Sequence, residues 1–408
     1  MSTIVPFQAL RPAPQLASQV ASRPYDVLNS HEAREEAADN PYSFLHITKA
    51  EIDLALNIDI HSPSVYDKAK ENLQAFIEKG ILLEEDKPCY YIYRLVMNGK
   101  SQTGLVCGSS VSDYEKNIIK KHELTRPDKE ADRINHMKTI RAQTGNVFLA
   151  YKYVTAIDDL IESWKSSHTP LYDFTAADGI SHTVWVVDDD ATIRSISGLF
   201  TTEVPFTYIA DGHHRAASAA KVRVALGAEA SRESDYFLTT LFPSTQLHIL
   251  DYNRLVHDLN GLSIQQFLNN LQKDFFVGKV DRAFSPGALH EFGLYLDGDW
   301  YQLVAKEGTY TADPIGVLDV TILQKNILDK LLAIKDPRTD KRIDFVGGIR
   351  GLAELEKRVD SGEMKAAFSL YPVSIQQLFD IADSGEIMPP KSTWFEPKLR
   401  DGLLTHLI

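Results

Sequence analysis

The sequence contains few cysteines and no long apolar run. Cys89 and Cys107 are its two cysteines among 408 residues, and they lack the CxxC spacing of redox and metal sites. No stretch approaches the roughly 20 consecutive apolar residues that a membrane-spanning helix needs. The opening residues, MSTIVPFQALRPAPQ, also lack the basic and apolar regions of a signal peptide. These absences predict a reduced, cytoplasmic protein that does not associate with membranes.

Basic residues are in the minority. The chain has 43 Lys and Arg against 56 Asp and Glu, which gives a formal net charge of −13. This balance argues against nonspecific nucleic-acid binding as the main role. An anionic ligand must then be bound by a local group of cations, so short basic motifs become the informative ones.

The length of the chain predicts two or three packed units. Helical and strand-like patterns are mixed without a regular strand–helix alternation, which favours an α+β fold with mixed sheets and flanking helices. The expected organisation is an N-terminal strap with an α/β segment over 1–110, a central α/β unit over 111–255 and a C-terminal α+β unit over 256–408.

Several elements are marked by their periodicity and by their turns. Residues 64–79 place apolar side chains on one helical face. Asn98-Gly99 and Asp297-Gly298 each separate two strand-like runs, as in hairpins. The runs SHTVWVVDD and VPFTYIA are predicted to be strands on either side of a polar link.

The strongest local signal is ADGHHR, between a strand and an alanine-rich helix. Gly212 relaxes the turn, and the N–H groups of the helix that follows attract an anion together with Arg215. Asp211 can orient a hydroxyl or accept its proton, and His213 and His214 can shuttle a proton. The alternative is a polar turn with one capping and one solvated histidine.

A second candidate group begins with the sequence HELT. His122 and Glu123 precede Thr125, which is predicted to cap a helix on which Lys129 and Arg133 share one face. A basic stripe in an acidic protein suits a polyphosphate or another small anion. A solvated face is the alternative, and the HExxH spacing of zinc enzymes is absent.

Three further segments are weaker candidates. Lys391-Ser392-Thr393 and the glycines before Arg350 resemble anion cradles, although neither forms a Walker A loop. Tyr25-Asp26 could meet a ligand, or the segment could simply pack as a strap. The aspartates at 188–190 are assigned to a turn, so no metal ligands are expected from the protein.

Taken together, the motifs resemble a known family. The series PFQALRP, PYDV, NPYSFLH, HELT, ADGHHR, YNRLV, DFVGG and PPKSTWFEPK runs from about Pro6 to Leu404. It resembles the bacterial and archaeal family called domain of unknown function 1015. The resemblance spans the chain but leaves the activity open.

A more distant resemblance carries functional content. ADGHHR is similar to the DGHHR motif of the free serine kinases of the ParB/sulfiredoxin-like superfamily. The resemblance implies a ParB/sulfiredoxin-like core in which Asp211 to Arg215 form the phosphate-gripping and catalytic turn. It leaves the catalytic carboxylate open among Asp26, Glu123 and Asp211.

These observations predict a phosphotransferase. It would move a phosphoryl group between a small donor, pyrophosphate or an adenine nucleotide, and a small hydroxyl metabolite, with L-serine and O-phosphoserine preferred. Exchangeable Mg²⁺ is the expected cofactor. The alternatives are a ParB-like nucleotide-binding regulatory module without metabolite turnover, and a metal-dependent hydrolase built on His122, Glu123, Asp211, His213 and His214. A homo-oligomer is compatible with the sequence.

The predicted site residues fall into two groups. Those expected to act in catalysis are Asp211, His213, His214, Glu123 and Asp26. Those expected to bind phosphate or substrate are Gly212, Arg215, His122, Thr125, Lys129, Arg133, Tyr25, Lys391, Ser392 and Thr393.

Overall fold

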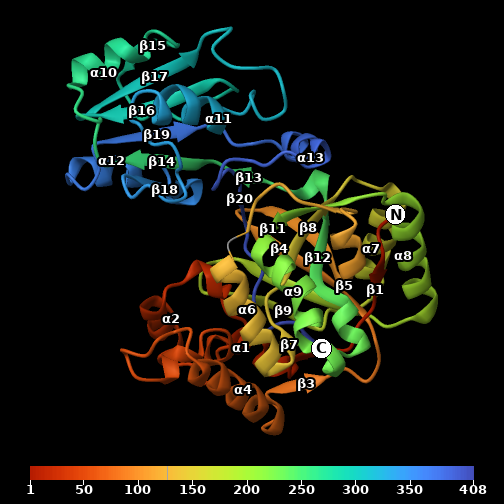
Figure 1. Ribbon diagram of the computed structural model, residues 1–408. Helices are drawn as coiled ribbons and strands as arrows, with labels where there is room; N and C mark the ends of the chain where they lie inside the picture. The colour runs from red at the N-terminus through yellow and green to blue at the C-terminus, as the bar shows by residue number, and fades with distance from the viewer. Residues whose placement is uncertain (126) are drawn as a thin grey trace. The chain divides into compact units, whose positions relative to one another are not determined.

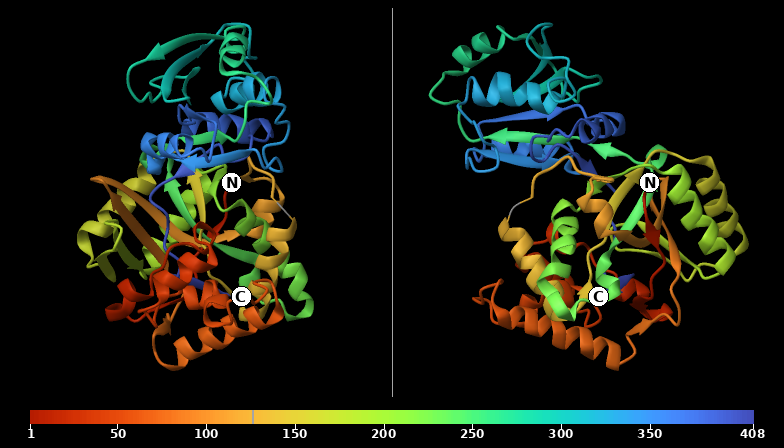
Figure 2. Two further views of the ribbon diagram at one scale, coloured as in Figure 1. Left: turned by 90° about the vertical axis from the view of Figure 1, so that its left-hand side faces the viewer. Right: turned by 45° about the vertical axis from the view of Figure 1, so that its right-hand side comes forward.

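The computed structural model describes residues 1–125 and 127–408. The chain divides into two compact units. The first consists of Met1–Leu247 together with Pro397–Ile408, and the second consists of His248–Glu396. Both chain termini therefore lie in the first unit (Figure 2). The predicted division at residues 110 and 255 is finer than this one and stays a prediction.

The first unit contains a large mixed sheet. In spatial order its strands are β6 (Ile119–Lys120), β11 (Thr207–Asp211), β8 (Val147–Tyr151), β12 (Tyr236–Pro243), β5 (Lys100–Ser110), β4 (Tyr90–Met97), β10 (Ser181–Val187) and β9 (Tyr172–Thr175), while β1 (Ile4–Val5) pairs with β5 (Figure 1). The pairs β11–β6 and β12–β8 are parallel, and the other pairs are antiparallel. The predicted hairpin at Asn98-Gly99 is confirmed as the β4–β5 connection.

Nine helices are found in the described part of the first unit. They are α1 (Ala17–Val20), α2 (Ser30–Ala37), α3 (Leu45–Thr48), α4 (Pro63–Glu78), α5 (Val111–Glu115), α6 (Pro127–Ile140), α7 (Thr155–Ser167), α8 (Asp190–Glu203) and α9 (His213–Leu226). Helices α6 and α9 lie side by side (Figure 1). The helix predicted over 64–79 is confirmed as α4.

The main core of this unit joins the sheet to helices α7, α8 and α9. Leu149 and Tyr151 of β8 are fully buried in it, and the Tyr151 ring meets the Phe200 ring of α8 edge to face at 5.2 Å. A buried aromatic pair of this kind contributes about 0.5–1.5 kcal/mol beyond the burial of its area. The core therefore holds β8 and β11 rigidly beneath the start of α9.

A second sheet ties the chain termini together. Its order is β3 (Leu82–Glu84), β2 (Ala9–Pro12), β21 (Thr405–Leu407) and β7 (Ala142–Gln143). Residues 397–408 thus return to the first unit after the chain has passed through the whole of the second unit. This return proves important for the candidate site.

The second unit is built on an antiparallel sheet. Its strands follow the order β15 (Phe275–Val280), β17 (Asp299–Ala305), β16 (Glu291–Leu296), β19 (Ala366–Leu370), β14 (Tyr252–Val256) and β18 (Ile343–Gly347), and β13 (Ile249–Leu250) pairs with β20 (Trp394–Phe395). Its helices are α10 (Ile264–Leu271), α11 (Asp319–Leu323), a π-helix (Gln324–Asp329), α12 (Leu352–Asp360) and α13 (Ile375–Ser384). The hairpin at Asp297-Gly298 is confirmed as the β16–β17 connection.

One local prediction was wrong. The supposed polar link between SHTVWVVDD and VPFTYIA contains helix α8. The Asp189 side chain caps this helix by accepting a hydrogen bond from the Thr192 N–H at 2.8 Å, so the aspartate run forms the start of α8 and not a separate turn. Ile196 and Phe200, four residues apart, bury one face of the helix. The many Ser and Thr residues around them had hidden this period.

Helix α6 stops at Ile140, and the next residue, Arg141, adopts a left-handed φ of 58°. The predicted cap at Thr125 depends on residue 126, which lies outside the described residues. The mixed α+β class itself is confirmed.

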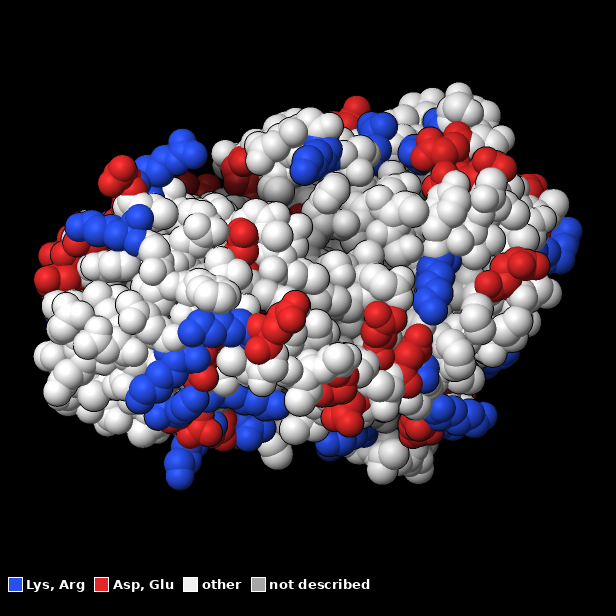
Figure 3. Space-filling view, turned by 90° about the horizontal axis from the view of Figure 1, so that it is seen from above, with Lys and Arg blue, Asp and Glu red and all other residues white. Residues whose placement is uncertain are grey.

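On the face shown in Figure 3, Lys and Arg side chains gather at the lower left around a few Asp and Glu side chains, and charges of both signs are interspersed elsewhere. Within residues 1–125 and 127–408, no helix is long and apolar enough to cross a membrane.

A candidate anion site at the start of helix α9

The ADGHHR motif forms the predicted turn between a strand and a helix. Strand β11 ends at Asp211, Gly212 is the N-cap with a φ of 97°, and α9 begins at His213. A Cβ at Gly212 would lie 3.2 Å from Arg215 Nε and 3.5 Å from Val147 Cα. Glycine is required here both by the left-handed backbone and by the lack of space.

Arg215 is buried below this turn. Its guanidinium donates to the backbone carbonyl of Asn146 and, at 3.3 Å, to Asp26 Oδ2. It also lies 3.5 Å from Asp211 Oδ2. Burial lowers the pKa of Arg215, but Asp26 and Asp211 outweigh burial and hold the pKa above its ordinary value. The site therefore has a permanent buried positive charge.

Lys398 reaches the same carboxylate from the returning C-terminal segment. Its Nζ donates to Asp211 Oδ2 at 3.0 Å. Burial alone would raise the pKa of Asp211, but the charges of Lys398 and Arg215 hold it below the ordinary value. Asp211 is therefore ionised at neutral pH, and one of its oxygens faces two cations. Sequence reasoning missed Lys398 because it chose the nearby Lys391, although both lie in the motif PPKSTWFEPK.

Two histidines lie against each other beside the turn. The backbone N–H of His122 donates to His213 Nε2 at 3.4 Å, so the proton of the His213 ring belongs on Nδ1. The two rings meet edge to face at 4.4 Å. Burial lowers the pKa of His122 to about 4 and that of His213 well below the ordinary value. Both imidazoles are neutral near pH 7.

Glu123 is the carboxylate that faces this pair. Its Oε2 lies 3.8 Å from His213 Nδ1, and its side chain is 37% exposed. His214 is half-buried on the next position of α9. The arrangement leaves Glu123 accessible to a ligand while a neutral imidazole stands behind it.

Three buried polar atoms around this turn have no hydrogen-bond partner among the described residues. They are His122 Nδ1, Asn146 Oδ1 and Arg215 Nε. Buried polar groups in folded proteins are nearly always paired, because an unpaired one costs about 1–3 kcal/mol. Their presence around a single helix N-terminus marks a place suited to a polar ligand.

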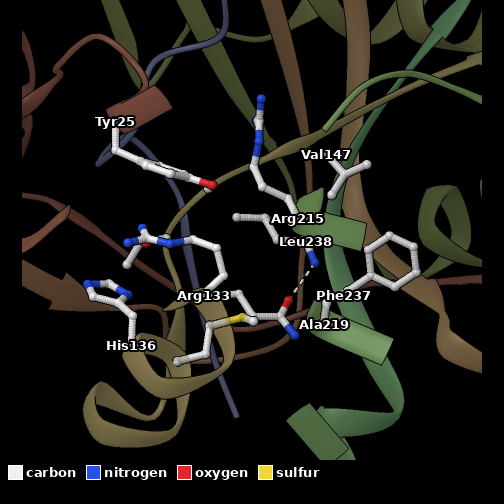
Figure 4. A pocket seen from close by; sticks show the side chains of 12 residues that line it. Tyr25, Arg133, His136, Val147, Arg215, Ala219, Phe237 and Leu238 are labelled. Carbon is white, nitrogen blue, oxygen red and sulfur yellow. Dashed lines mark hydrogen bonds between the residues drawn. The ribbon is translucent and has the colours of Figure 1, made fainter. Parts of the chain in front are cut away.

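The N-terminal strap closes one side of the site. Tyr25 and Asp26 belong to the 3-10 helix η2 (Tyr25–Val27). The Tyr25 ring stacks on the guanidinium of Arg133, 4.1 Å from ring centroid to Cζ (Figure 4). Tyr25, Arg133 and Arg215 line a cavity of about 20 Å³, which has room for about one water molecule.

Asp401 also contacts the strap. Its Oδ2 accepts a hydrogen bond from the Tyr25 N–H at 3.3 Å. Burial, reinforced by the neighbouring charge of Asp26, raises the pKa of Asp401 to about 7. Sequence reasoning missed this residue, since nothing local distinguishes it from other aspartates after a turn.

Among the remaining predicted residues, the Thr125 hydroxyl donates to the Glu130 carboxylate and Lys129 is exposed. Arg133, which lines the cavity with Tyr25, also pairs with Asp132. Lys391, Ser392 and Thr393 belong to the second unit, whereas the turn belongs to the first. The site can therefore be described within the first unit alone.

Acidic and histidine side chains do not gather into a metal centre. Within the described part of the chain, no group of three or more His, Cys, Asp or Glu side chains is arranged to hold a metal ion. At Asp211 one carboxylate oxygen already faces two cations.

Comparison with solved structures finds distant likenesses. A free serine kinase in complex with AMP has a TM-score of 0.37 and 12% identity, over 74% of this chain and 91% of that chain. A conserved hypothetical protein from Pyrococcus furiosus gives 0.37 and 13%, over 74% and 95%. SbnI with a C-terminal truncation from Staphylococcus aureus gives 0.32 and 11%, over 74% and 87%. At TM-scores below 0.5 these likenesses do not extend to activity or ligands.

Sequence comparison is more decisive about the family. No curated protein matches the chain. A family model, in contrast, matches residues 4–321, which include the strap, the HELT and ADGHHR motifs and most of the second unit's sheet. The chain belongs to the family described as Protein of unknown function (DUF1015).

Proposed function

We propose that the chain is a phosphotransferase. It would move a phosphoryl group between pyrophosphate or an adenine nucleotide and a small hydroxyl metabolite, with L-serine and O-phosphoserine as the preferred pair. The observation that carries the proposal is the meeting of Arg215, Lys398 and the N-terminus of α9 at Asp211. A ParB/sulfiredoxin-like core around β11 and α9 is part of the same proposal.

The cations have a direct role in such a reaction. Phosphoryl transfer needs neutralisation of the charge on the moving group and alignment of donor and acceptor. Arg215 and Lys398 share one oxygen of Asp211, so a phosphate can compete with that carboxylate for both. The N-terminus of α9 would add the favourable field of its helix dipole.

Glu123 is our choice for the group that takes the proton of the acceptor hydroxyl. A base must be reachable by the substrate, and the Glu123 side chain is 37% exposed beside neutral His213. Asp211 is a weaker choice, because its lowered pKa makes it a poor base. Asp26, which is bonded to Arg215, is suited to holding that arginine in place.

Mg²⁺ is proposed to bind together with the donor. Magnesium commonly takes one or two protein carboxylates plus phosphate oxygens and water, so a ready-made group of three ligands is not needed. Asp26 is a partly exposed carboxylate suited to this purpose, in addition to its contact with Arg215. The ion would neutralise charge on the transferred group.

Phosphorus NMR tests the proposal. The protein is incubated with Mg²⁺, serine and each of ATP, ADP and pyrophosphate, and then with phosphoserine in the reverse direction. Exchange of phosphate in one donor–acceptor pair is expected. It should be lost in Lys398→Met and kept in Lys116→Met, which removes an exposed lysine from the same unit. No exchange with any pair would refute the phosphotransferase.

A nucleotide-binding regulatory module is the second candidate. The same cations and helix N-terminus would grip a nucleotide without turnover. Tight nucleotide binding without exchange in the NMR assay would favour this alternative. The metal-dependent hydrolase has no corresponding support, since the described histidines and carboxylates form no group of three.

A further inference from the structure

Three motifs meet in the second unit, whereas the turn before α9 belongs to the first unit. YNRLV forms β14, DFVGG forms β18 and the turn after it, and PPKSTW leads into β20. Arg254 of β14 lies at their meeting point and is 3% exposed. Its strand partners are Phe345 and Phe368.

The charge of Arg254 is not compensated by a carboxylate. Its guanidinium donates to the backbone carbonyls of Tyr252 and, at 3.2 Å, of Pro390. Its Cζ lies 5.4 Å from the centre of the Phe345 ring. Among the described residues, no carboxylate forms an ion pair with it. Burial lowers the pKa of Arg254 to about 10, which still leaves it charged at neutral pH.

The nearest carboxylate in the sequence points to the other side of the strand. Successive side chains of a strand alternate between its two faces, so Arg254 and Tyr252 share one face and Asn253 takes the other. Asp251 Oδ2 accepts from Asn253 Nδ2 at 2.5 Å, and a Cβ at Gly348 would overlap the Asp251 carboxylate. Asp251 is therefore held away from Arg254.

The loop that follows α13 covers the guanidinium. Pro390 supplies a carbonyl to Arg254, and Lys391, with a left-handed φ of 58°, brings its Nζ to 5.7 Å from the centre of the Tyr252 ring. The indole of Trp394 lies against Gly347, where an added Cβ would be 2.8 Å from two ring atoms. The Phe345 ring thus lies beside the buried arginine, while Lys391 Nζ and the Trp394 indole lie against the Tyr252 ring.

We propose that the second unit contains its own anion site, with Arg254 as its buried cation and Lys391 as its exposed cation, which binds a phosphate group. Buried charges in proteins are normally paired with an opposite charge, and Arg254 has backbone carbonyls in place of one. The presence of a second cation favours a doubly charged anion over a carboxylate. The Pro390 carbonyl would leave Arg254 as the phosphate enters. The aromatic rings would add affinity only for a phosphate that carries a base.

Titration calorimetry on the full chain tests this site, with inorganic phosphate and ADP as the probes. The Lys398→Met background weakens the site at α9, so the two sites are separated. In that background we expect one equivalent of phosphate to bind, and Arg254→Met to weaken the binding at least about tenfold, the worth of a charge-assisted hydrogen bond. Tighter binding of ADP than of inorganic phosphate would show that the bound phosphate group belongs to a nucleotide.

Two further variants keep the test decisive if the Arg254→Met protein does not fold. Lys391→Met removes an exposed lysine and should weaken phosphate binding about two- to fivefold, whereas Lys341→Met, an exposed lysine of the same unit, should leave it unchanged. Phosphate should also raise the melting temperature of the Lys398→Met protein by mass action. Unchanged phosphate affinity in a folded Arg254→Met protein, or in Lys391→Met if the former does not fold, would overturn the proposal.

Discussion

Lys398 Nζ lies 3.0 Å from Asp211 Oδ2, across 187 residues of sequence. This ion pair joins the end of β11 to the segment that returns from the second unit. Because Arg215 faces the same oxygen at 3.5 Å, one carboxylate holds two cations at the start of α9.

Removing Lys398 should affect function more than folding. We expect Lys398→Met to weaken phosphate binding about tenfold, as loss of a charge-assisted hydrogen bond does. Turnover should fall about 100-fold or more if the lysine stabilises the transferred group. Titration calorimetry and the phosphorus NMR assay measure the two effects. Equal phosphate binding by Lys398→Met and Lys116→Met would contradict the assigned role.

Glu123→Gln should separate binding from chemistry. The amide keeps the shape of the side chain but cannot take a proton, so turnover should fall about 100-fold or more. Phosphate affinity should change little, because Arg215 and Lys398 are untouched. The same assay on Asp211→Asn is the comparison. If Asp211→Asn keeps phosphate binding and loses turnover while Glu123→Gln does not, the two carboxylates have been assigned the wrong way round.

Gly212→Ala should damage the turn in two ways. A left-handed backbone costs an L-residue about 1–2 kcal/mol. The added methyl group would also press on Arg215 Nε at 3.2 Å. Gly80→Ala is the matched control, since Gly80 has a φ of 66° and nothing within 4 Å of an added Cβ. Denaturant unfolding and phosphate titration should show a loss of stability in both variants and a loss of binding in Gly212→Ala alone.

Asp401 should make the protein less stable as the pH rises. Its pKa is raised to about 7 in the folded state, above the ordinary value of about 3.9 for an unfolded aspartate. Between these values the folded state binds more protons than the unfolded one, so this residue's contribution to stability falls from about pH 4 to pH 7.

Asp401→Asn isolates that contribution, because the amide oxygen can still accept from the Tyr25 N–H. Urea unfolding at about pH 4.5 and at about pH 7.5, on either side of most of this window, should show the variant gaining stability relative to the unmodified protein at the higher pH. A constant difference between the two proteins at both pH values would mean that Asp401 does not titrate in this window.

The sequence predicted what depends on neighbours in the chain. Gly212 and the alanine-rich run after it predict the turn and α9. Asn98-Gly99 and Asp297-Gly298 predict the two hairpins. Helix α8 was missed because Ser and Thr dilute its apolar period.

Contacts that depend on the three-dimensional path of the chain could not be predicted from the sequence. Choosing Lys398 over Lys391 requires knowing that the chain re-enters the first unit at Pro397. Long-range packing likewise decides that Asp401 accepts a hydrogen bond from the Tyr25 backbone. It also decides that, among the described residues, no carboxylate pairs with Arg254. Residue type alone could not reveal them.

The return of residues 397–408 also orders events during synthesis. A growing chain that has passed Leu226 can already form β11, the Gly212 turn and α9. It must still make the whole of residues 248–396 before Lys398 leaves the ribosome. Until then Asp211 has Arg215 but not Lys398, so the pair of cations at this carboxylate is incomplete. The complete pair thereby forms only after both units have been made.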